Sequence, residues 1–195
     1  MQRLAITPMV PVQVCNSSQV HCKLEFLNPS GSTKDRIARF ILEKAWRERR
    51  IGPDTTVVEA SSGSTSIALA LACAQLGLRF VAVMQEGVSS ERLQMIRAFG
   101  GEGVSTPSTL GIRGAIAETE RMAQVGEVFL PRQFSNMENA SAHRFGTARE
   151  ILDTAPGGAV DANRQRSRNR RHTGWPLSGP LRCPMPSDPR SCAPG

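Results

Sequence analysis

The sequence is poor in the residues and patterns that several large classes of protein require. It has no tyrosine and only three histidines, and its five cysteines form no C-x-x-C pair and no metal-type spacing with histidine. The longest uninterrupted apolar run, Ile67–Ala74, is far too short to cross a membrane. The first residues lack the apolar core of a secretory signal. We therefore expect a reduced, cytoplasmic protein with no metal site and no membrane association.

Acidic and basic residues are distributed unevenly along the chain. The 195 residues carry 24 lysines and arginines against 17 acidic residues, a net charge of +7. Residues 163–195 hold seven arginines and a single acidic residue, so residues 1–162 are nearly neutral. A neutral body argues against a uniformly basic, nucleic-acid-binding domain. Residues 163–195 also show neither helical nor strand periodicity, which predicts a disordered basic tail.

The body of the chain alternates between short apolar runs and longer amphipathic stretches. Short runs rich in apolar and β-branched residues predict buried strands at Thr55–Ala60, Arg79–Met84 and Val128–Leu130. Stretches with helical spacing predict helices at Asp35–Arg50, Ile67–Leu76, Ser89–Phe99 and Ile112–Gln124. Gly77 suits the end of the second of these helices. Strands that alternate with helices predict an α/β fold whose parallel sheet is covered on both faces.

A lysine follows a tight turn at the predicted start of the first helix. The turn is Asn28–Thr33 (NPSGST), and Lys34 comes directly after it. Most lysines in front of a helix are solvated surface residues. A helix N-terminus nevertheless disfavours a cation, which lowers the pKa of an amine there and helps it act as a nucleophile or base. The string is not a Walker A loop, because no glycine precedes the lysine at the required spacing.

Two polar clusters follow predicted strands. Glu59–Ser66 (EASSGSTS) lies between a strand and a helix, where hydroxyls, backbone N–H groups and the helix dipole together suit a carboxylate or phosphate. Taken alone, this cluster favours ordinary Ser/Thr capping of the helix. Gln133–His143 (QFSNMENASAH) follows a short strand and is by itself only a polar loop.

Taken together and in order, these segments resemble the cysteine synthase / cystathionine β-synthase family, which are pyridoxal-phosphate (PLP) enzymes of fold type II. The similar segments are Thr7–Val10 (TPMV), Asn28–Arg36 (NPSGSTKDR), Ser61–Ser66 (SSGSTS) and Gln133–His143. The resemblance covers roughly residues 4–162. It implies a three-layer α/β sandwich of the tryptophan synthase β-like kind, incomplete in this chain, and a family-like homodimer. The Asp35-Arg36 pair is closer to cysteine synthase than to the serine/threonine dehydratases.

The resemblance implies a role for each matched residue. Lys34 would carry PLP and then act as the general base at the substrate Cα. The substrate α-carboxylate would be bound by Ser61, Ser62, Gly63, Thr65 and Gln133. Ser64 would contact the cofactor in the place where the family has an asparagine, and Ser66 replaces a glycine. The implied reaction is β-replacement on a small amino acid, such as O-acetylserine and sulfide giving cysteine and acetate.

The resemblance also implies a discontinuous division into domains. Residues 1–34 and 145–162 would belong to a larger cofactor domain, and residues 35–144 to a smaller α/β domain. Without later strands, the sheet of the larger domain is expected to have an unpaired edge and an uncovered apolar face. Such a surface predicts poor solubility or self-association.

The resemblance stops after Ala162. The family follows a strand like Gly158–Ala162 with a Gly/Thr loop, G-T-G-G-T, whose N–H groups hold the PLP phosphate, and this string is absent here. Residues 163–174 can be encoded by codons that, read one nucleotide later, give IVSGVGTGGTL. We chose those codons to fit, so they establish compatibility only. Our hypothesis is a one-nucleotide frameshift directly after Ala162, which resequencing of the gene would test.

Three functional interpretations stay open from the sequence. One is an active β-replacement enzyme, and another is a catalytically inactive fragment that lacks the phosphate loop. A third, in which the basic residues 163–195 bind nucleic acid, is disfavoured because this segment has one aromatic residue, many prolines and no helical pattern.

Overall fold

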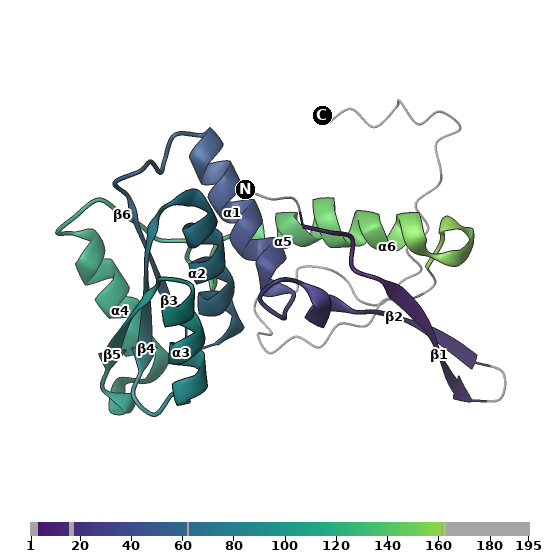
Figure 1. The fold of residues 1–195 in the computed structure, drawn as a ribbon, viewed down its shortest axis with the longest axis horizontal. Coiled ribbons are helices and arrows are strands. Elements are labelled where there is room, and N and C mark those ends of the chain that lie inside the picture. Colours follow the sequence, from purple (N-terminus) through teal and green to yellow (C-terminus); the bar gives the residue numbers. More distant parts are fainter. Residues whose placement is uncertain (1–3, 16–17, 62, 161, 163–195) are drawn as a thin grey trace.

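The computed structural model describes residues 4–15, 18–61, 63–160 and 162. Figure 1 shows two parts, a parallel sheet with its helices and a long hairpin that lies beside a helix from the end of the described chain. The predicted disordered tail and the proposed frameshift both concern residues outside this described part. None of the helices in the described part is long and apolar enough to span a membrane.

The sheet of the described residues has four strands, all parallel, in the order β5-β4-β3-β6. Their bounds are β3 Thr56–Ala60, β4 Arg79–Gln85, β5 Glu102–Thr106 and β6 Val128–Phe129. The strands β3 and β4 lie at the centre and are buried almost throughout. Burial on both faces requires apolar residues at consecutive positions, which the runs TVVEA and RFVAVM supply.

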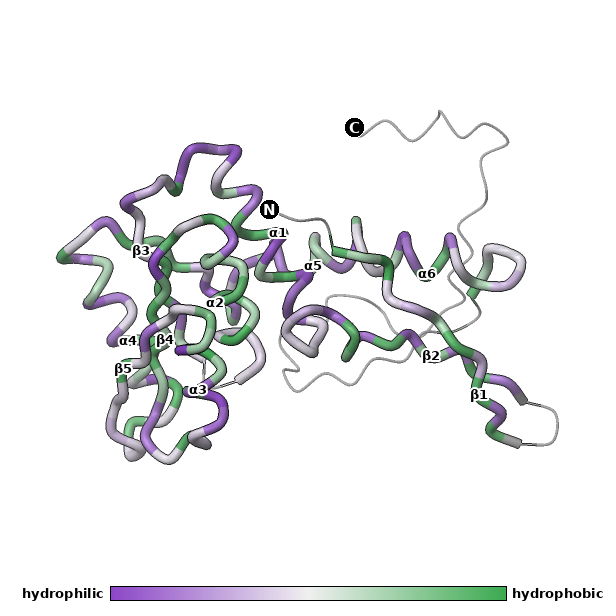
Figure 2. Tube along the Cα trace, viewed as in Figure 1, coloured by the Kyte–Doolittle hydropathy of each residue, from purple (hydrophilic) through white to green (hydrophobic). Residues whose placement is uncertain are grey.

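Helices cover both faces of this sheet. The four helices are α1 Lys34–Arg47, α2 Ser64–Leu76, α3 Ser90–Ala98 and α4 Gly111–Ala123. Side chains alternate between the two faces of β3 and β4, so Val57 and Phe80 pack with α1, α2 and α3, while Val58 and Val81 pack with α4. Figure 2 shows how hydrophobic α2 is along its length, as expected for a helix between the sheet and α1. The predicted three-layer α/β sandwich with a parallel sheet is confirmed.

The predicted helices and strands of this part agree with the structure to within a few residues. Gly77 ends α2 in the left-handed conformation, with φ of 69°, as predicted. Helix α2 begins at Ser64, three residues before the predicted start, because the small polar residues before the apolar run form its first turn. Strand β5 was not predicted, since EGVST has no apolar run and β5 lies at the edge of the sheet. The strand-like stretch Gly158–Ala162 does not form a strand over its described residues. Gly158 ends a 3-10 turn, and Val160 forms only an isolated β-bridge.

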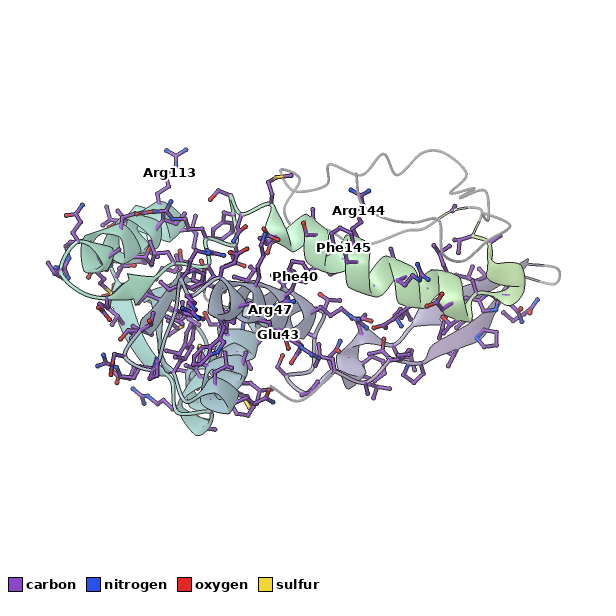
Figure 3. The ribbon with its side chains drawn as sticks, turned by 90° about the horizontal axis from the view of Figure 1, so that it is seen from above. Phe40, Glu43, Arg47, Arg113, Arg144 and Phe145 are labelled. Atoms are coloured by element: carbon purple, nitrogen blue, oxygen red, sulfur yellow. The ribbon has the colours of Figure 1, made fainter. Side chains whose placement is uncertain are left out.

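The second part consists of an antiparallel hairpin and a helical segment. The hairpin strands are β1 Met9–Cys15 and β2 Ser18–Lys23. The helical segment is α5 Glu138–Ala142, a π-helical turn at His143–Thr147, and α6 Ala148–Thr154. Figure 3 shows Phe40 on α1 beside the beginning of this segment, which carries Arg144 and Phe145. The domain boundaries implied by the resemblance stay a prediction.

A buried arginine joins the two parts. The Arg36 guanidinium, with a side chain only 5% exposed, donates to both carboxylate oxygens of Glu25 at 2.6 and 2.8 Å and of Glu150 at 2.7 and 2.8 Å. Thr7 Oγ1 donates to Glu25, and Lys23 Nζ lies 2.9 Å from Glu150. Burial raises the pKa of both glutamates, but the hydrogen bonds and charge of Arg36 more than offset it and lower the pKa overall. The network therefore ties the N-terminal segment and α6 to the start of α1.

We expect Arg36→Ala to destabilise the fold strongly. Removing the arginine leaves two half-buried carboxylates without their main partner, which costs roughly 3 kcal/mol or more. The free energy of unfolding from urea titration measures this loss. Arg121→Ala is the matched control, because Arg121 forms only an exposed pair with Glu118 within α4 and its loss should leave the unfolding midpoint unchanged. Equal midpoints for the two variants would contradict a central role for Arg36.

One face of the hairpin carries exposed valines. Val12 pairs with Val20 across the two strands, so both side chains lie on the same face, and Val14 follows at a bulge in the first strand. The side chains remain exposed, Val12 to 43%, Val20 to 49% and Val14 to 60%. The hairpin therefore exposes apolar surface that another chain could cover.

We expect the purified chain to self-associate through this face. The double variant Val12→Thr/Val20→Thr keeps β-branched residues in the strands but removes apolar surface, so it should shift the chain toward the monomer. Sedimentation velocity over a range of concentrations measures the change. Gln19→Thr on the opposite face is the control. A wild-type chain that stays monomeric at all concentrations would show that the valine face does not drive association.

Candidate active site

The predicted site residues lie at the carboxyl edge of the parallel sheet. Helix α1 precedes β3 and runs antiparallel to it, so Lys34, its first residue, lies at the edge where β3 ends. The loop after β3 leads directly into α2, which packs against α1 and begins at the same edge. Ligands of open parallel sheets bind at this edge, because the loops and helix N-termini that gather there can contact them.

Lys34 is a half-buried amine that directly follows a hydrogen-bonded turn. Burial lowers the pKa of Lys34, the same direction that its place at a helix N-terminus predicts. Asp35 holds the preceding turn by accepting hydrogen bonds from the backbone N–H and hydroxyl of Ser30. The backbone N–H of Lys34 donates to Ser32 Oγ at 3.2 Å. The neighbouring pair Asp35-Arg36 therefore fixes both the turn and the helix start around the lysine.

Lys34 also differs from the other lysines of the chain. The sequence contains only three, and each of the other two forms an ion pair with a glutamate. Lys23 pairs with Glu150, and Lys44 pairs with Glu138, which raises the pKa of Lys44. Within the described residues, Lys34 has no such ion pair. Burial without a counter-charge therefore favours the neutral form of Lys34.

His143, in the π-helical turn, is electrostatically coupled to Lys34. Burial, and then the positive charges of Lys34 and Arg36, lower the pKa of His143 to about 4. Its Nδ1 lies 3.0 Å from Thr147 Oγ1. The imidazole is therefore neutral at physiological pH. In the sequence, His143 is marked only as the last residue of the Gln133–His143 segment, which predicts no separate role for it.

The loop after β3 is closed by hydrogen bonds among its own residues. Ser66 Oγ donates to the Ser61 carbonyl at 2.6 Å, and the Gly63 N–H donates to Ser61 Oγ at 3.3 Å. The hydroxyl of Ser66, fully buried, thus stabilises the loop at the position where the resemblance has a glycine. Ser64 is exposed at the first residue of α2. Ser62 lies outside the described residues.

Two predicted site residues that are far apart in the sequence meet directly. Thr65 Oγ1 donates to Gln133 Oε1 at 2.7 Å, and Gln133 Nε2 donates to the Ala60 carbonyl at 3.0 Å. The polar loop at Gln133 therefore packs onto the loop after β3. The structure brings Ser61, Gly63, Thr65 and Gln133 into one cluster, and Lys34 with His143 into a second at the same edge of the sheet.

Glu59 is a buried carboxyl to which the sequence analysis gave no role. It is 2% exposed, and its Oε2 accepts the backbone N–H of Gln133 at 3.1 Å. Burial raises the pKa of Glu59 to about 7, and backbone hydrogen bonds, that of Gln133 first, oppose this rise. Glu59 contacts Gln133, which lies 74 residues later in the sequence, so no local sequence pattern could have identified its role.

Other reactive groups of the described residues do not contribute to the site. Burial raises the pKa of Cys73 to about 12, which leaves it an inert thiol. Among the residues that the structure describes, no cluster of histidine, cysteine and acidic side chains could hold a metal ion. Two shallow hollows of about 460 and 520 Å³ lie beside Arg50 and Val128, and no predicted site residue lines them.

This fold and site define a class of protein. A half-buried lysine and a hydroxyl-rich loop lie at the carboxyl edge of its parallel sheet. Residues 2–163 match the family described as "Pyridoxal-phosphate dependent enzyme". The chain belongs to this family.

Relatives of known name agree with this membership. Cysteine synthase B of Campylobacter jejuni is 48% identical over 134 residues, which cover 68% of this chain and 45% of that protein. Cysteine synthase of Staphylococcus aureus is 42% identical over 147 residues, 75% of this chain and 47% of that protein. The chain thus spans about half the length of the curated relatives it matches.

Solved structures give the same result for the fold. An O-acetylserine-dependent cystathionine β-synthase from Helicobacter pylori superposes with a TM-score of 0.72 at 34% identity, over 76% of this chain and 51% of that chain. A cysteine synthase from Entamoeba histolytica gives a TM-score of 0.75 at 34% identity, over 81% and 49%. The incomplete fold type II architecture implied by the resemblance is confirmed.

The buried Glu59 predicts a specific dependence of stability on pH. Its pKa is about 7 in the folded chain against 4.5 for the free side chain, so the folded state retains a proton that the unfolded state loses. The resulting stabilisation is present below pH 4.5 and is lost as the pH rises to about 7. From pH 5 to pH 8, Glu59→Gln should therefore gain roughly 2 to 3 kcal/mol relative to wild type.

Urea denaturation of both proteins at intervals between pH 5 and pH 8 measures this difference. Other titrating groups, including His143, are common to the two proteins and cancel in the comparison. Parallel stability profiles across this range would show that Glu59 titrates normally.

Proposed function

We propose that the protein is a PLP-dependent β-replacement enzyme of the cysteine synthase type. Its substrate would be a small amino acid with a leaving group on Cβ, such as O-acetyl-L-serine, and its second substrate sulfide or another small nucleophile. The names of the relatives support this reaction. The structural observation that carries it is Lys34, a half-buried lysine without a carboxylate partner, at the same sheet edge as the Thr65–Gln133 cluster.

Lys34 is the residue that would hold PLP. An amine reacts with a carbonyl only in its neutral form, and the lowered pKa of Lys34 increases the fraction in that form. Bound PLP supplies an electron sink for the negative charge that develops at the substrate Cα. The Lys34 amine would take the proton from that carbon as a general base. The neutral His143 nearby adds no competing positive charge.

The loop after β3 and Gln133 would bind the substrate carboxylate. Residues Ser61, Ser62, Gly63 and Thr65 precede or begin α2, so their N–H and hydroxyl groups and the helix dipole suit an anion. The second amide hydrogen of Gln133 Nε2 would complete this set, since the first is bonded to Ala60. Ser64, the exposed first residue of α2, would contact the cofactor ring.

The remaining features of the proposal rest on the family. The protein would be homodimeric and cytoplasmic. In the structure, Cys22 and Cys73 are both free thiols. The 195 residues contain no G-T-G-G-T string to hold the PLP phosphate. This observation favours an alternative in which the chain as given is an inactive fragment that does not retain PLP.

A visible absorption spectrum separates the two possibilities. We expect the purified chain to gain the visible band of lysine-bound PLP when the cofactor is added, and Lys34→Ala to lose it. Lys44→Ala is the control and should keep the band, because Lys44 lies on the same helix but is paired with Glu138. A band that survives Lys34→Ala would overturn the assignment of Lys34, and a wild-type chain without PLP after gel filtration would favour the inactive fragment.

A further inference from the structure

We propose that Glu59 is a positioning residue that fixes Gln133 in the orientation needed to bind the substrate carboxylate. The proposal rests on the proposed function, since it concerns the same carboxylate site. Glu59 does not contact the reacting atoms in this account. It acts through the backbone of Gln133, which its carboxyl anchors to β3.

Every polar group of Gln133 has a partner in the structure. Its backbone N–H donates to Glu59 Oε2 at 3.1 Å, and its backbone carbonyl accepts from the Asn139 amide. Its side-chain Nε2 donates to the Ala60 carbonyl at 3.0 Å, and its Oε1 accepts from Thr65 at 2.7 Å. Four contacts from three different segments therefore define one orientation of this residue.

Glu59 is the one ionisable group among these partners, and its position in the sheet is costly. It is the fourth residue of β3, pairs in register with Ala82 of β4, and is 2% exposed. By alternation it lies on the same side of the sheet as Val57, within the layer filled by α1 and α2. Burying a carboxyl there is unfavourable unless it makes hydrogen bonds that an apolar residue cannot make.

The bond from Glu59 supplies what the segment around Gln133 otherwise lacks. Strand β6 pairs with β3 over only two positions and ends at Phe129, so Gln133 lies beyond the sheet hydrogen bonds. Arg132, just before it, has a positive φ of 54°, a conformation that non-glycine residues rarely adopt without support. The Glu59 carboxyl continues the connection between β3 and this segment after the strand pairing has ended.

Two substitutions distinguish positioning from simple filling of the core. Glu59→Gln keeps an oxygen that can accept the Gln133 N–H, whereas Glu59→Leu has a similar size and no acceptor. Binding of L-serine, as the probe, is followed by NMR of the isotope-labelled chain without cofactor. Hydrogen exchange of the Gln133 amide is measured on the same samples.

We expect Glu59→Leu to weaken L-serine binding about tenfold and to speed exchange of the Gln133 amide by at least tenfold, the order expected when a buried donor loses its partner. Glu59→Gln should remain within about twofold of wild type in both measurements. Val58→Ala is the control for lost stability, because Val58 lies on the face of β3 opposite to Glu59 and packs with α4. It should leave L-serine binding unchanged.

The proposal is overturned if folded Glu59→Leu binds L-serine as wild type does and keeps the Gln133 amide protected. It is also overturned if Val58→Ala reproduces both effects, since general destabilisation would then explain them. A wild-type chain that does not bind L-serine contradicts the carboxylate site of the proposed function. In that case, exchange of the Gln133 amide in the same variants still decides the role of Glu59.

Discussion

The structure depends on one buried guanidinium. Arg36 binds Glu25 from the N-terminal segment and Glu150 from α6, residues that are 11 and 114 positions away from it. An arginine can do this because its planar fork presents donors to two carboxylates at once, which a lysine cannot. Arg36 lies two residues after Lys34, so the contact that joins the two parts of the molecule also fixes the start of α1 and the lysine on it.

A second anchor lies on the other side of the site. Glu59, Ala60 and Thr65 hold Gln133 against the end of β3 and the beginning of α2. The two anchors use different segments, one the N-terminal segment and α6 and the other the sheet and the loop before α5. The candidate site is the region between them, with the Lys34 amine at one anchor and the proposed carboxylate-binding residues at the other. Such a division allows the chemistry and the substrate contacts to be positioned independently.

Local patterns predicted the parts of the fold that local physics controls. The runs TVVEA and RFVAVM became β3 and β4, and Gly77 ended α2, because burial and left-handed conformation act over a few residues. The edge strand β5 and the hairpin were missed, since EGVST has no apolar run and Pro11 interrupts the pattern of the first hairpin strand. The partners of Arg36 and Glu59 could not be predicted, because these charges meet only after distant segments pack. The motifs identified the residues of the candidate site but not the buried charges that position them.

The central claim is that Lys34 is the residue that carries PLP. Reductive trapping of PLP on the intact protein with borohydride, followed by peptide mapping, tests it most directly, because the chain offers only three lysines. The account predicts that the label lies on Lys34 alone, since Lys23 and Lys44 form ion pairs with Glu150 and Glu138. A label on Lys23 or Lys44, or one spread evenly over the three, would contradict it.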